Sequence, residues 1–530
     1  MKRVLATICL LLALMTVLSA CGSAQQASTS TAQSSAATAA TETVAVASAT
    51  TDPSAIDTST PVELVMYLVG DQYPGCQAVY DEVNKMLKKD INATVTVKFT
   101  SWQTDQKIPL ILASGEDFDC IYTASWAEYV SSATRKGFLE ITPDLLQKYM
   151  PDFYKDIPQG LLDNTKINGK AYMIPYAMIQ VYNYSSAIIR SDLREKYNIP
   201  ELKTLDDLDN YMLTVAKNEK GIIPFDGNMA NFYWDFPCLY YAQPQNLYLG
   251  IERSLELFSV KLDDPSGKIN YILDDPKYLD FIMRMKKLSD GGAWSKNIIS
   301  SQDTSDQAIK AGKSCVDVHH LGSMEGRTLD IQGISGASSE VYDFSTDSLK
   351  PATSGTQSGM AIHASSKNVE RTLMMLNLFG TRQDYYDLLD CGIKGTDYDL
   401  VEDKVKELPG ADKNYPFGAA CPWGWQNAKL QRTAYGVPPI EKDWTTKWES
   451  EGKVYTGPYI AFIFDDSNVK NEMAACLNIV KSNGYSLVTG MMSDPAAELE
   501  KYKARLKSVG IDKIQSELQQ QLTDYLNSSK

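Results

Sequence analysis

Residues 169–193, with the sequence GKAYMIPYAMIQVYNYSSAIIRSDL, decide the fold, because they predict a strand that leaves one folded unit and enters a second. The run 176–184 is rich in aromatic and β-branched residues and contains no Gly or Pro, which favours a buried, extended strand. Ser185 and Ser186 are expected to end this strand. Ser191 then has the character of a helix N-cap, with Asp192 in the first turn. From these residues alone, an interior strand of one large domain is an equal alternative.

The same stretch resembles the hinge region of the family 1 extracellular solute-binding proteins, the sugar-binding receptors of bacterial ABC importers. The resemblance is carried by the run 168–175, NGKAYMIP, and by Tyr182-Asn183 and Ser191-Asp192-Leu193. It implies that the strand crosses between two lobes and that the ligand lies in the cleft between them, with Tyr182 beside it. The implied fold class is α/β, a two-lobe periplasmic-binding-protein-like fold (type II) in which each lobe is a sheet flanked by helices.

Length and charge narrow the classes of function. A single hydrophobic core usually stops growing at about 250 to 300 residues, so a chain of 530 residues is expected to form two lobes or more. With 66 acidic and 51 basic residues the net charge is −15, which disfavours binding to phosphate backbones or anionic lipids through bulk electrostatics. Nucleic acid is therefore not an expected partner.

The N-terminus predicts an export signal and a lipid anchor. Lys2 and Arg3 precede the apolar run 4–17, which is short for a membrane span and typical of a signal peptide over residues 1–20. The residues LSAC at 18–21 have the form of a lipobox, so Cys21 is expected to carry acyl chains such as palmitate on the outward face of the membrane. An ordinary cleavage site is the alternative. Residues 21–60, rich in Ser, Thr and Ala, are expected to be a disordered tether.

Cysteine and histidine spacing argues against a metal site or a redox motif. Beyond the signal and the anchor, no two cysteines form a CxxC pair, and they are expected to be buried thiols. The chain has only three histidines, His319, His320 and His363, which do not make a zinc site. We therefore expect no metal and no cofactor.

Three aromatic residues follow the predicted strands of the first lobe. A strand over 62–69, a helix over 78–89, and strands over 94–99 and 120–123 predict a parallel α/β sheet. Ligands of such sheets bind beyond the carboxyl ends of the strands, which is where Trp126, Trp102 and Tyr73 are placed. An aromatic face suits the apolar face of a pyranose ring. The alternative for Trp126 is that it packs a helix start against the sheet.

The second lobe supplies further candidates. The resemblance places aromatics of the segment 231–237 in the cleft, which selects Tyr233 and Trp234, with Asn231 as a hydroxyl partner. A strand over 315–320 ends at the predicted cleft, where His319 and His320 face opposite sides and His320 is the candidate ligand residue. The loop 416–427 brings Trp423, which either contacts the ligand or, with Trp425, fills an apolar seam.

The C-terminal part extends the resemblance to a Gram-positive lipoprotein subgroup with a C-terminal domain of unknown function. The motifs are FDDS at 464–467, VKNE at 469–472, LVTG at 487–490 and GIDK at 510–513. Asp494-Pro495 predicts a helix that Gly510 ends, and a second helix follows. The expected boundaries are 61–182 and 359–395 for lobe 1, 183–358 and 396–455 for lobe 2, and 456–530 for a C-terminal helical unit.

Three classes of function are compatible with this pattern. An anchored glycoside hydrolase would need two carboxylates across a cleft, for which Asp119, Asp235 or Asp397 with Asp399 are the candidates. An adhesion, signalling or peptide-binding lipoprotein would bind a protein or a peptide. The chain has no GxSxG or HExxH motif, so the prediction is a non-catalytic, monomeric, lipid-anchored extracellular receptor. It would deliver a solute, most plausibly an oligosaccharide, to an ABC permease by hinge closure.

Overall fold

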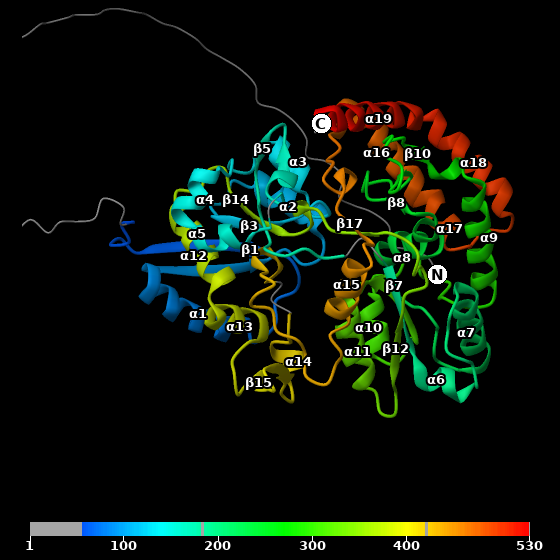
Figure 1. The fold of residues 1–530 in the computed structure, drawn as a ribbon, viewed down its shortest axis with the longest axis horizontal. Helices are drawn as coiled ribbons and strands as arrows, with labels where there is room; N and C mark the ends of the chain where they lie inside the picture. Colours follow the sequence, from blue (N-terminus) through cyan, green and yellow to red (C-terminus); the bar gives the residue numbers. More distant parts are fainter. Residues whose placement is uncertain (1–55, 159, 182–184, 419–421, 529–530) are drawn as a thin grey trace, which may run out of the picture. The chain divides into compact units, whose positions relative to one another are not determined.

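Two separate sheets organise the computed structural model, which describes residues 56–158, 160–181, 185–418 and 422–528. The lobe 1 sheet has five strands in the order β2-β1-β3-β14-β6, namely Ala93–Phe99, Val62–Leu68, Cys120–Thr123, Gly359–Ile362 and Ile174–Pro175. The lobe 2 sheet has the order β11-β7-β12, namely Val316–His320, Ser185–Arg190 and Ser339–Tyr342. Figure 1 labels these elements along the chain. The predicted signal peptide, Cys21 and almost all of the predicted tether lie outside the described residues.

Lobe 1 begins with the strand, helix and strand that the sequence predicts. Strands β1 and β2 pair in parallel, and β3 pairs in parallel with the other side of β1. The connecting helix α1, Cys76–Ile91, buries Val79, Val83 and Leu87 at helical spacing against this sheet. The other helices of the lobe are α2 (Thr104–Ala113), α3 (Tyr129–Thr134), α4 (Pro143–Tyr149), α5 (Pro151–Asp156), α12 (Val369–Thr381) and α13 (Gln383–Cys391).

Lobe 2 is built around β7, which pairs antiparallel with β11 on one side and β12 on the other. Thr204 and Asp207 form a capping box at the start of α7. A smaller sheet has the order β10-β9-β8, namely Asn270–Tyr271, Phe258–Lys261 and Leu247–Tyr248. The helices of the lobe are α6 (Ser191–Lys196), α7 (Leu205–Asn218), α8 (Met229–Pro237), α9 (Pro276–Asp290), α10 (Ser305–Lys310), α11 (Met324–Gln332) and α15 (Ile440–Ser450).

Residues 169–193 pass from lobe 1 to lobe 2, but the strand in this stretch lies later than predicted. Residues 176–181 form no strand, residues 182–184 lie outside the description, and β7 begins at Ser185. Ser185 and Ser186, expected to end the strand, instead pair with His320 and His319 of β11. Pairing with β11 overrides the turn preference of these two serines. Ser191 is also not an N-cap, because its hydroxyl contacts that of Ser338 at 2.6 Å.

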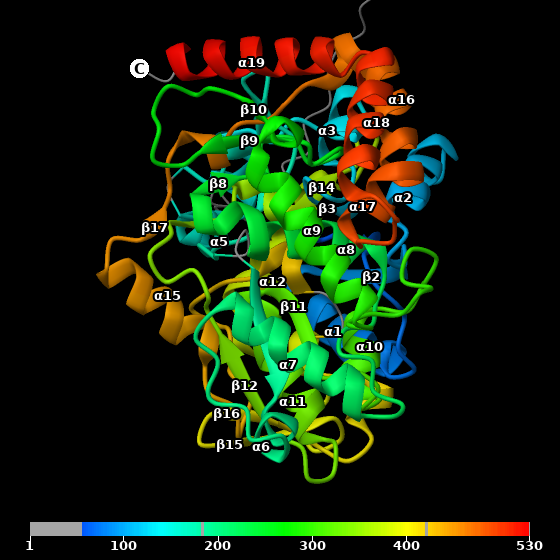
Figure 2. The same cartoon turned by 90° about the vertical axis from the view of Figure 1, so that its right-hand side faces the viewer.

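The C-terminal unit is helical, as predicted, and shares the core of lobe 2. Asp494 accepts a hydrogen bond from Ala497 N at the start of α18, and Gly510 after it has φ +100°. Leu506 of α18 and Leu522 of α19 are fully buried in the same apolar cluster as the residues of α9. Figure 2 shows α18 beside α16 and α17. The bounds are Lys470–Ile479 (α16), Tyr485–Val488 (α17), Pro495–Ser508 (α18) and Ile511–Ser528 (α19).

Residues 396–455, which the sequence assigned to lobe 2, contact lobe 1 with their first half and lobe 2 with their second half. The first half lies against lobe 1, because Gly75 N donates to Asn414 O at 2.9 Å and Tyr415 OH donates to Leu389 O at 2.7 Å. Helix α15 packs on α11 of lobe 2. The chain therefore crosses between the lobes a third time before Ile440. The β15 and β16 hairpin of this segment, Tyr398–Val401 and Lys404–Glu407, is largely polar, so its sequence does not indicate which lobe it contacts.

Two further expectations concern the cysteines and the membrane. The six described free cysteines are all buried, which fits the prediction of small apolar side chains. Cys421 lies outside the description. Within the described part of the chain, none of the helices combines the length and hydropathy that a membrane span requires.

Asp119 joins three segments of lobe 1, and its loss should destabilise the fold. The buried carboxylate accepts from Val65 N at 2.8 Å, Ser366 Oγ at 2.7 Å and Asn368 Nδ2 at 3.0 Å. Asp119→Ala leaves these donors without an acceptor and should lower the free energy of unfolding by about 3 kcal/mol in urea denaturation. The exposed Asp117→Ala is the matched control and should change it by less than about 0.5 kcal/mol. Equal effects of the two substitutions would contradict this role.

Candidate functional site

Three of the predicted tryptophans come together at one edge of lobe 1. The ring centroids of Trp102 and Trp423 are 5.7 Å apart, and those of Trp126 and Trp423 are 6.5 Å apart. Tyr122 completes the group, with its ring 5.7 Å from Trp126 and 6.3 Å from Trp423. These four residues are called the aromatic platform below. Its members lie far apart in the sequence, so tertiary structure assembles it.

The parallel strands explain why two of these tryptophans are neighbours. Trp102 follows β2 and Trp126 follows β3, and both strands pair in parallel with β1, so their carboxyl ends meet at one edge of the sheet. The Trp126 indole N–H donates to Gln357 O at 3.0 Å. This bond orients the ring toward the segment that precedes β14.

Trp423 is fixed by backbone contacts. Ser358 Oγ donates to Trp423 O at 2.8 Å and also contacts Tyr122 OH at 3.0 Å. Gly424 lies so close to β14 that an added Cβ would meet Met360 Sδ at 2.4 Å. Only a glycine permits this approach, which holds the short helix η7, Pro422–Trp425, against the sheet edge.

The platform is open to solvent to different degrees. Trp102 is 53% exposed, Trp126 and Trp423 are half-buried, and Tyr122 is buried beneath them. Trp425, the other tryptophan in the loop 416–427, is fully buried, and its ring centroid lies 5.1 Å from that of Phe379. The two alternatives for the loop 416–427, a place at the predicted ligand site and the filling of an apolar seam, therefore apply to different tryptophans. Trp425 fills the seam, and Trp423 belongs to the platform.

The other predicted lobe 1 candidates are Tyr73 and residues that the structure does not describe. Tyr73 lies half-buried between β1 and α1, where its carbonyl accepts from Cys76 N at 3.1 Å. Tyr182 and Cys21 lie outside the described residues.

The candidates on α8 of lobe 2 have different surroundings. The Arg253 guanidinium lies over the Trp234 ring, 4.1 Å from its centroid, which is a cation–π geometry. Tyr233 donates to Leu255 O at 3.1 Å and places its ring 5.1 Å from Tyr485 of the C-terminal unit. Asn231 is half-buried in the first turn of α8. Of the three, Tyr233 contacts the C-terminal unit.

The adjacent histidines form a hydrogen-bonded group with Asp235. Buried Asp235 accepts from Ser185 Oγ at 2.8 Å and contacts His319 Nδ1 at 2.9 Å. Burial lowers the pKa of His319, but the charge and hydrogen bond of Asp235 outweigh it, so the net pKa is raised. Burial, followed by the positive charges of His319 and Arg327, holds the pKa of His320 well below its usual value. The sequence suggested Asp235 only as a candidate catalytic carboxylate and did not predict its contact with His319.

Strand alternation predicts that His319 and His320 face opposite sides, but in the structure the two imidazole rings lie next to one another. Their centroids are 4.3 Å apart at an interplanar angle of 47°. His320 is the last residue of β11, and its Nε2 lies 3.2 Å from Ser323 Oγ in the turn that follows. The strand ends at this point, so the period of two no longer fixes the side-chain direction.

The crossings between the lobes are joined by hydrogen bonds. Thr353 N donates to Gln180 O at 2.8 Å, and the hydroxyl groups of Thr353 and Tyr176 form a hydrogen bond with one another. Ala177 N donates to Gln426 O at 2.7 Å, which ties in the segment leading to the third crossing. Glu441 of α15 lies beside this group, because Gln180 hydrogen-bonds to its side chain.

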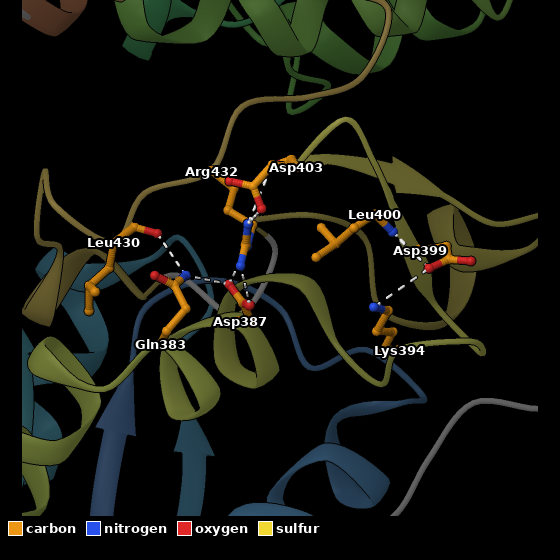
Figure 3. Close-up of polar contacts among 8 residues, drawn as sticks. All are labelled: Gln383, Asp387, Lys394, Asp399, Leu400, Asp403, Leu430 and Arg432. Carbon is orange, nitrogen blue, oxygen red and sulfur yellow. Dashed lines mark hydrogen bonds and ion pairs between the residues drawn. The ribbon is translucent and has the colours of Figure 1, made fainter.

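The carboxylates proposed for a hydrolase are engaged as acceptors. Asp397 accepts from Ile393 N at 2.8 Å and from Asn414 Nδ2 at 2.6 Å. Figure 3 shows Asp399 bonded to Leu400 N at 2.8 Å, with Lys394 at 3.9 Å. The candidate carboxylates Asp397 and Asp399 thus each contact residues near them in the chain, around the start of the hairpin. Asp119 and Asp235 have the structural bonds described above.

The same hairpin is clamped by an arginine. Arg432 Nε donates to Asp387 Oδ1 at 2.8 Å and Nη1 donates to Asp403 Oδ1 at 2.6 Å (Figure 3). Nη2 also donates to Asp387 Oδ2 at 3.0 Å, so the bond pair with Asp387 is bidentate, and the bond to Asp403 joins α13 to the β15 and β16 hairpin. Among the described residues, no group of His, Cys, Asp and Glu has the arrangement that a metal ion requires.

Comparison with known proteins shows which proteins this chain is similar to. Residues 458–527 match a family model described as a domain of unknown function, DUF3502. A Streptococcus pneumoniae serotype 4 protein named carbohydrate ABC transporter substrate-binding protein is 21% identical over 483 residues, which cover 90% of this chain and 93% of that protein.

Solved structures agree with this comparison. The crystal structure of the N-glycan transport solute-binding protein NgtS from S. pneumoniae has a TM-score of 0.73 and 21% identity, covering 89% of this chain and all of that chain. The S. pneumoniae substrate-binding protein FusA in complex with kestose has a TM-score of 0.57 and 18% identity, covering 88% of this chain and all of that chain. The chain has the fold of the two-domain solute-binding proteins. The resemblance to this class, and to the subgroup with a C-terminal domain of unknown function, is confirmed.

Glu441 should make the stability of the hinge depend on pH. Burial and the nearby charge of Glu325 raise the pKa of Glu441 to about 7 from its usual 4.5. The neutral form is favoured in the folded state, so its stabilising contribution is complete below pH 4.5 and is lost as the pH rises through about 7. Glu441→Gln should therefore flatten the fall in melting temperature between about pH 5 and pH 8.

Glu449→Gln is the matched control, because Glu449 is an exposed glutamate on the same helix. This control should keep the pH dependence of the unmodified chain. An identical pH profile for Glu441→Gln and the unmodified chain would contradict the role assigned to Glu441.

Proposed function

We propose that the chain is a receptor that binds an oligosaccharide between its lobes and delivers it to the permease of an ABC importer. The observation that carries this proposal is the aromatic platform, in which Trp102, Trp126 and Trp423 converge where ligands of parallel sheets bind. Stacked rings offer apolar faces to the C–H groups of a pyranose, while neighbouring polar groups bond its hydroxyls. The similarity to NgtS, an N-glycan transport protein, and to FusA, which was solved in complex with kestose, supports the same class of ligand.

The proposed site has a second wall on lobe 2. Trp234, with the Arg253 guanidinium over its ring, and His320, beside the Asp235 group, are its candidate contacts. Trp234 is half-buried and also packs against the lobe 2 core, so the exposed part of its ring is what we propose to contact a sugar. Tyr73, Tyr182 and Asn231 remain candidates for the rim, and Tyr233 for positioning α8.

Hinge closure is the proposed mechanism. A solute that contacts both the aromatic platform and lobe 2 favours the closed state, and it can shift the equilibrium only by its difference in affinity for the closed and open states. The closed form would dock on the permease. The crossings near Tyr176, Thr353 and Ile440 are where backbone rotation would be absorbed.

The proposal includes two finer statements. The chain acts without catalysis, since the candidate carboxylates Asp119, Asp235 and Asp397 each accept structural hydrogen bonds. It works outside the cell, held at the membrane by acyl chains on Cys21, which the lipobox sequence supports.

A panel of ligands tests the class of solute. Neutral oligosaccharides, amino acids and short peptides are added to the purified chain, and the melting temperature is recorded. A ligand that binds only the folded state raises it by mass action. We expect shifts with oligosaccharides and none with peptides, with the sugars recovered intact by chromatography. Shifts confined to peptides, or release of a hydrolysed product, would overturn the proposal.

Trp102→Ala should weaken sugar binding without unfolding the protein. The side chain is 53% exposed, so its removal leaves the core unchanged, while one stacking surface is lost. The expected change is about a tenfold rise in Kd, or about 1.4 kcal/mol, by calorimetric titration with a sugar from the panel. Tyr435→Ala removes another exposed ring and should leave Kd unchanged. If both variants bind like the unmodified chain, Trp102 is not part of the site.

A further inference from the structure

A recess of about 730 Å³ lies in lobe 2 where the C-terminal unit meets the small sheet. Its lining comes from β8, β9 and β10, from the start of α9 and from Gln515 of α19. None of the residues of the aromatic platform lines it. In volume it falls in the range of ligand sites, about 300 to 1,000 Å³. Figure 2 shows β8, β9 and β10 below α19.

One face of the small sheet forms the floor of the recess. Ser259 and Lys261 are alternate residues of β9, and Asn270 pairs directly with Ser259, so the three side chains share a face. The other face carries Phe258 and Val260, which are buried in the lobe 2 core. The sheet therefore has one face in the core and one polar face turned to the recess.

The floor contains a buried hydroxyl without a partner. Ser259 is fully buried, and its Oγ forms no hydrogen bond with any described residue. Tyr271 also lines the recess, but it pairs with Phe258, so its ring lies on the core face of the sheet. Buried polar groups are nearly always bonded, so the Ser259 hydroxyl on the recess face points to a polar occupant.

Most of the residues that line the recess have polar side chains. Only Pro244, Leu247 and Ile269 among the lining residues lack a hydrogen-bonding side chain. The polar members are Tyr241, Gln245, Asn246, Ser259, Lys261, Lys268, Asn270, Tyr271, Asp274, Asp275, Lys277 and Gln515. Amides, hydroxyls and charged groups offer both donors and acceptors, together with two tyrosine rings. A compound with many hydroxyl groups matches such a lining.

The charges of the recess nearly cancel. Lys261 pairs with Asp263 at 3.3 Å, and Asp274 pairs with Lys503 at 2.8 Å. The Lys268 and Lys277 ammonium groups form no salt bridge with a described residue and remain as donors. With the net charge of −15 on the whole chain, this balance favours a neutral ligand over an anion.

The C-terminal unit completes the recess. Gln519 of α19 donates to Gly267 O at 2.9 Å and accepts from Ile269 N at 2.8 Å, which fixes the helix on the loop between β9 and β10. This bond pair holds Gln515, one turn earlier, at the wall. Lobe 2 alone would lack that wall.

We propose that this recess is a second saccharide site, in which β9, β10, α9 and α19 bind a neutral sugar unit outside the cleft between the lobes. It gives the C-terminal unit a part in ligand binding. The inference is independent of the aromatic platform, because the two sites share no residue.

Photoaffinity mapping tests the second site on the full chain. The probes are maltotriose, mannotriose and chitotriose, each carrying a diazirine at the reducing end, and labelled peptides are identified by mass spectrometry after irradiation. At least one probe is expected to label peptides from 241–277 or around Gln515. Asn270→Ala combined with Lys268→Ala removes an amide and an exposed ammonium, both at the recess, without loss of core volume. It should lower that labelling by roughly tenfold, as expected for two lost hydrogen bonds.

Two controls separate this inference from the proposed function. Lys220→Ala removes an exposed lysine after α7 and should change no labelling. Trp102→Ala should lower labelling near the aromatic platform and leave the recess peptides unchanged. The inference is overturned if none of the probes labels the recess peptides, or if the double variant labels them as the unmodified chain does. Loss of platform labelling alone would count against the proposed function and leave the second site standing.

Discussion

The hydrogen bonds that join the chain crossings set the relation between the two lobes. Gln180 and Tyr176 of the first crossing bond to Thr353 of the second, and Ala177 bonds to Gln426 on the way to the third. Tyr176 is fully buried, so its hydroxyl depends on this partner. A hinge of this kind keeps each lobe intact while its backbone allows rotation.

The same crossings place the aromatic platform. Gln357 and Ser358, which end the second crossing, bond to Trp126 and to the Trp423 backbone. The tryptophans of the platform are thus attached to the hinge as well as to the sheet edge. A change in the hinge would alter the spacing of the rings, and ligand contact with the rings would favour particular hinge conformations.

The carboxylates that could have served catalysis are engaged in hydrogen bonds within the fold. Its candidate carboxylates cap backbone N–H groups or orient neighbouring side chains, as Asp119 does with β1 and Asp235 with His319. A polar group without such a partner, the Ser259 hydroxyl, lies instead on the recess face of the small sheet beneath α19. The small sheet, α9 and α19 share one apolar core, so the recess belongs to lobe 2 and the C-terminal unit together.

The sequence by itself determined the elements whose periodicity is strong and local. The β1, α1 and β2 succession, the capping box at Thr204 and the stripe of α18 and α19 follow from side-chain spacing and caps. It also placed Trp102 and Trp126 beyond parallel strands, because strand direction fixes where such residues gather. Only the tertiary structure decided that β7 starts at Ser185, that residues from 396 onward first contact lobe 1, and that Tyr233 turns toward Tyr485. These features depend on pairing between segments distant in the chain, whose energies local propensity does not contain.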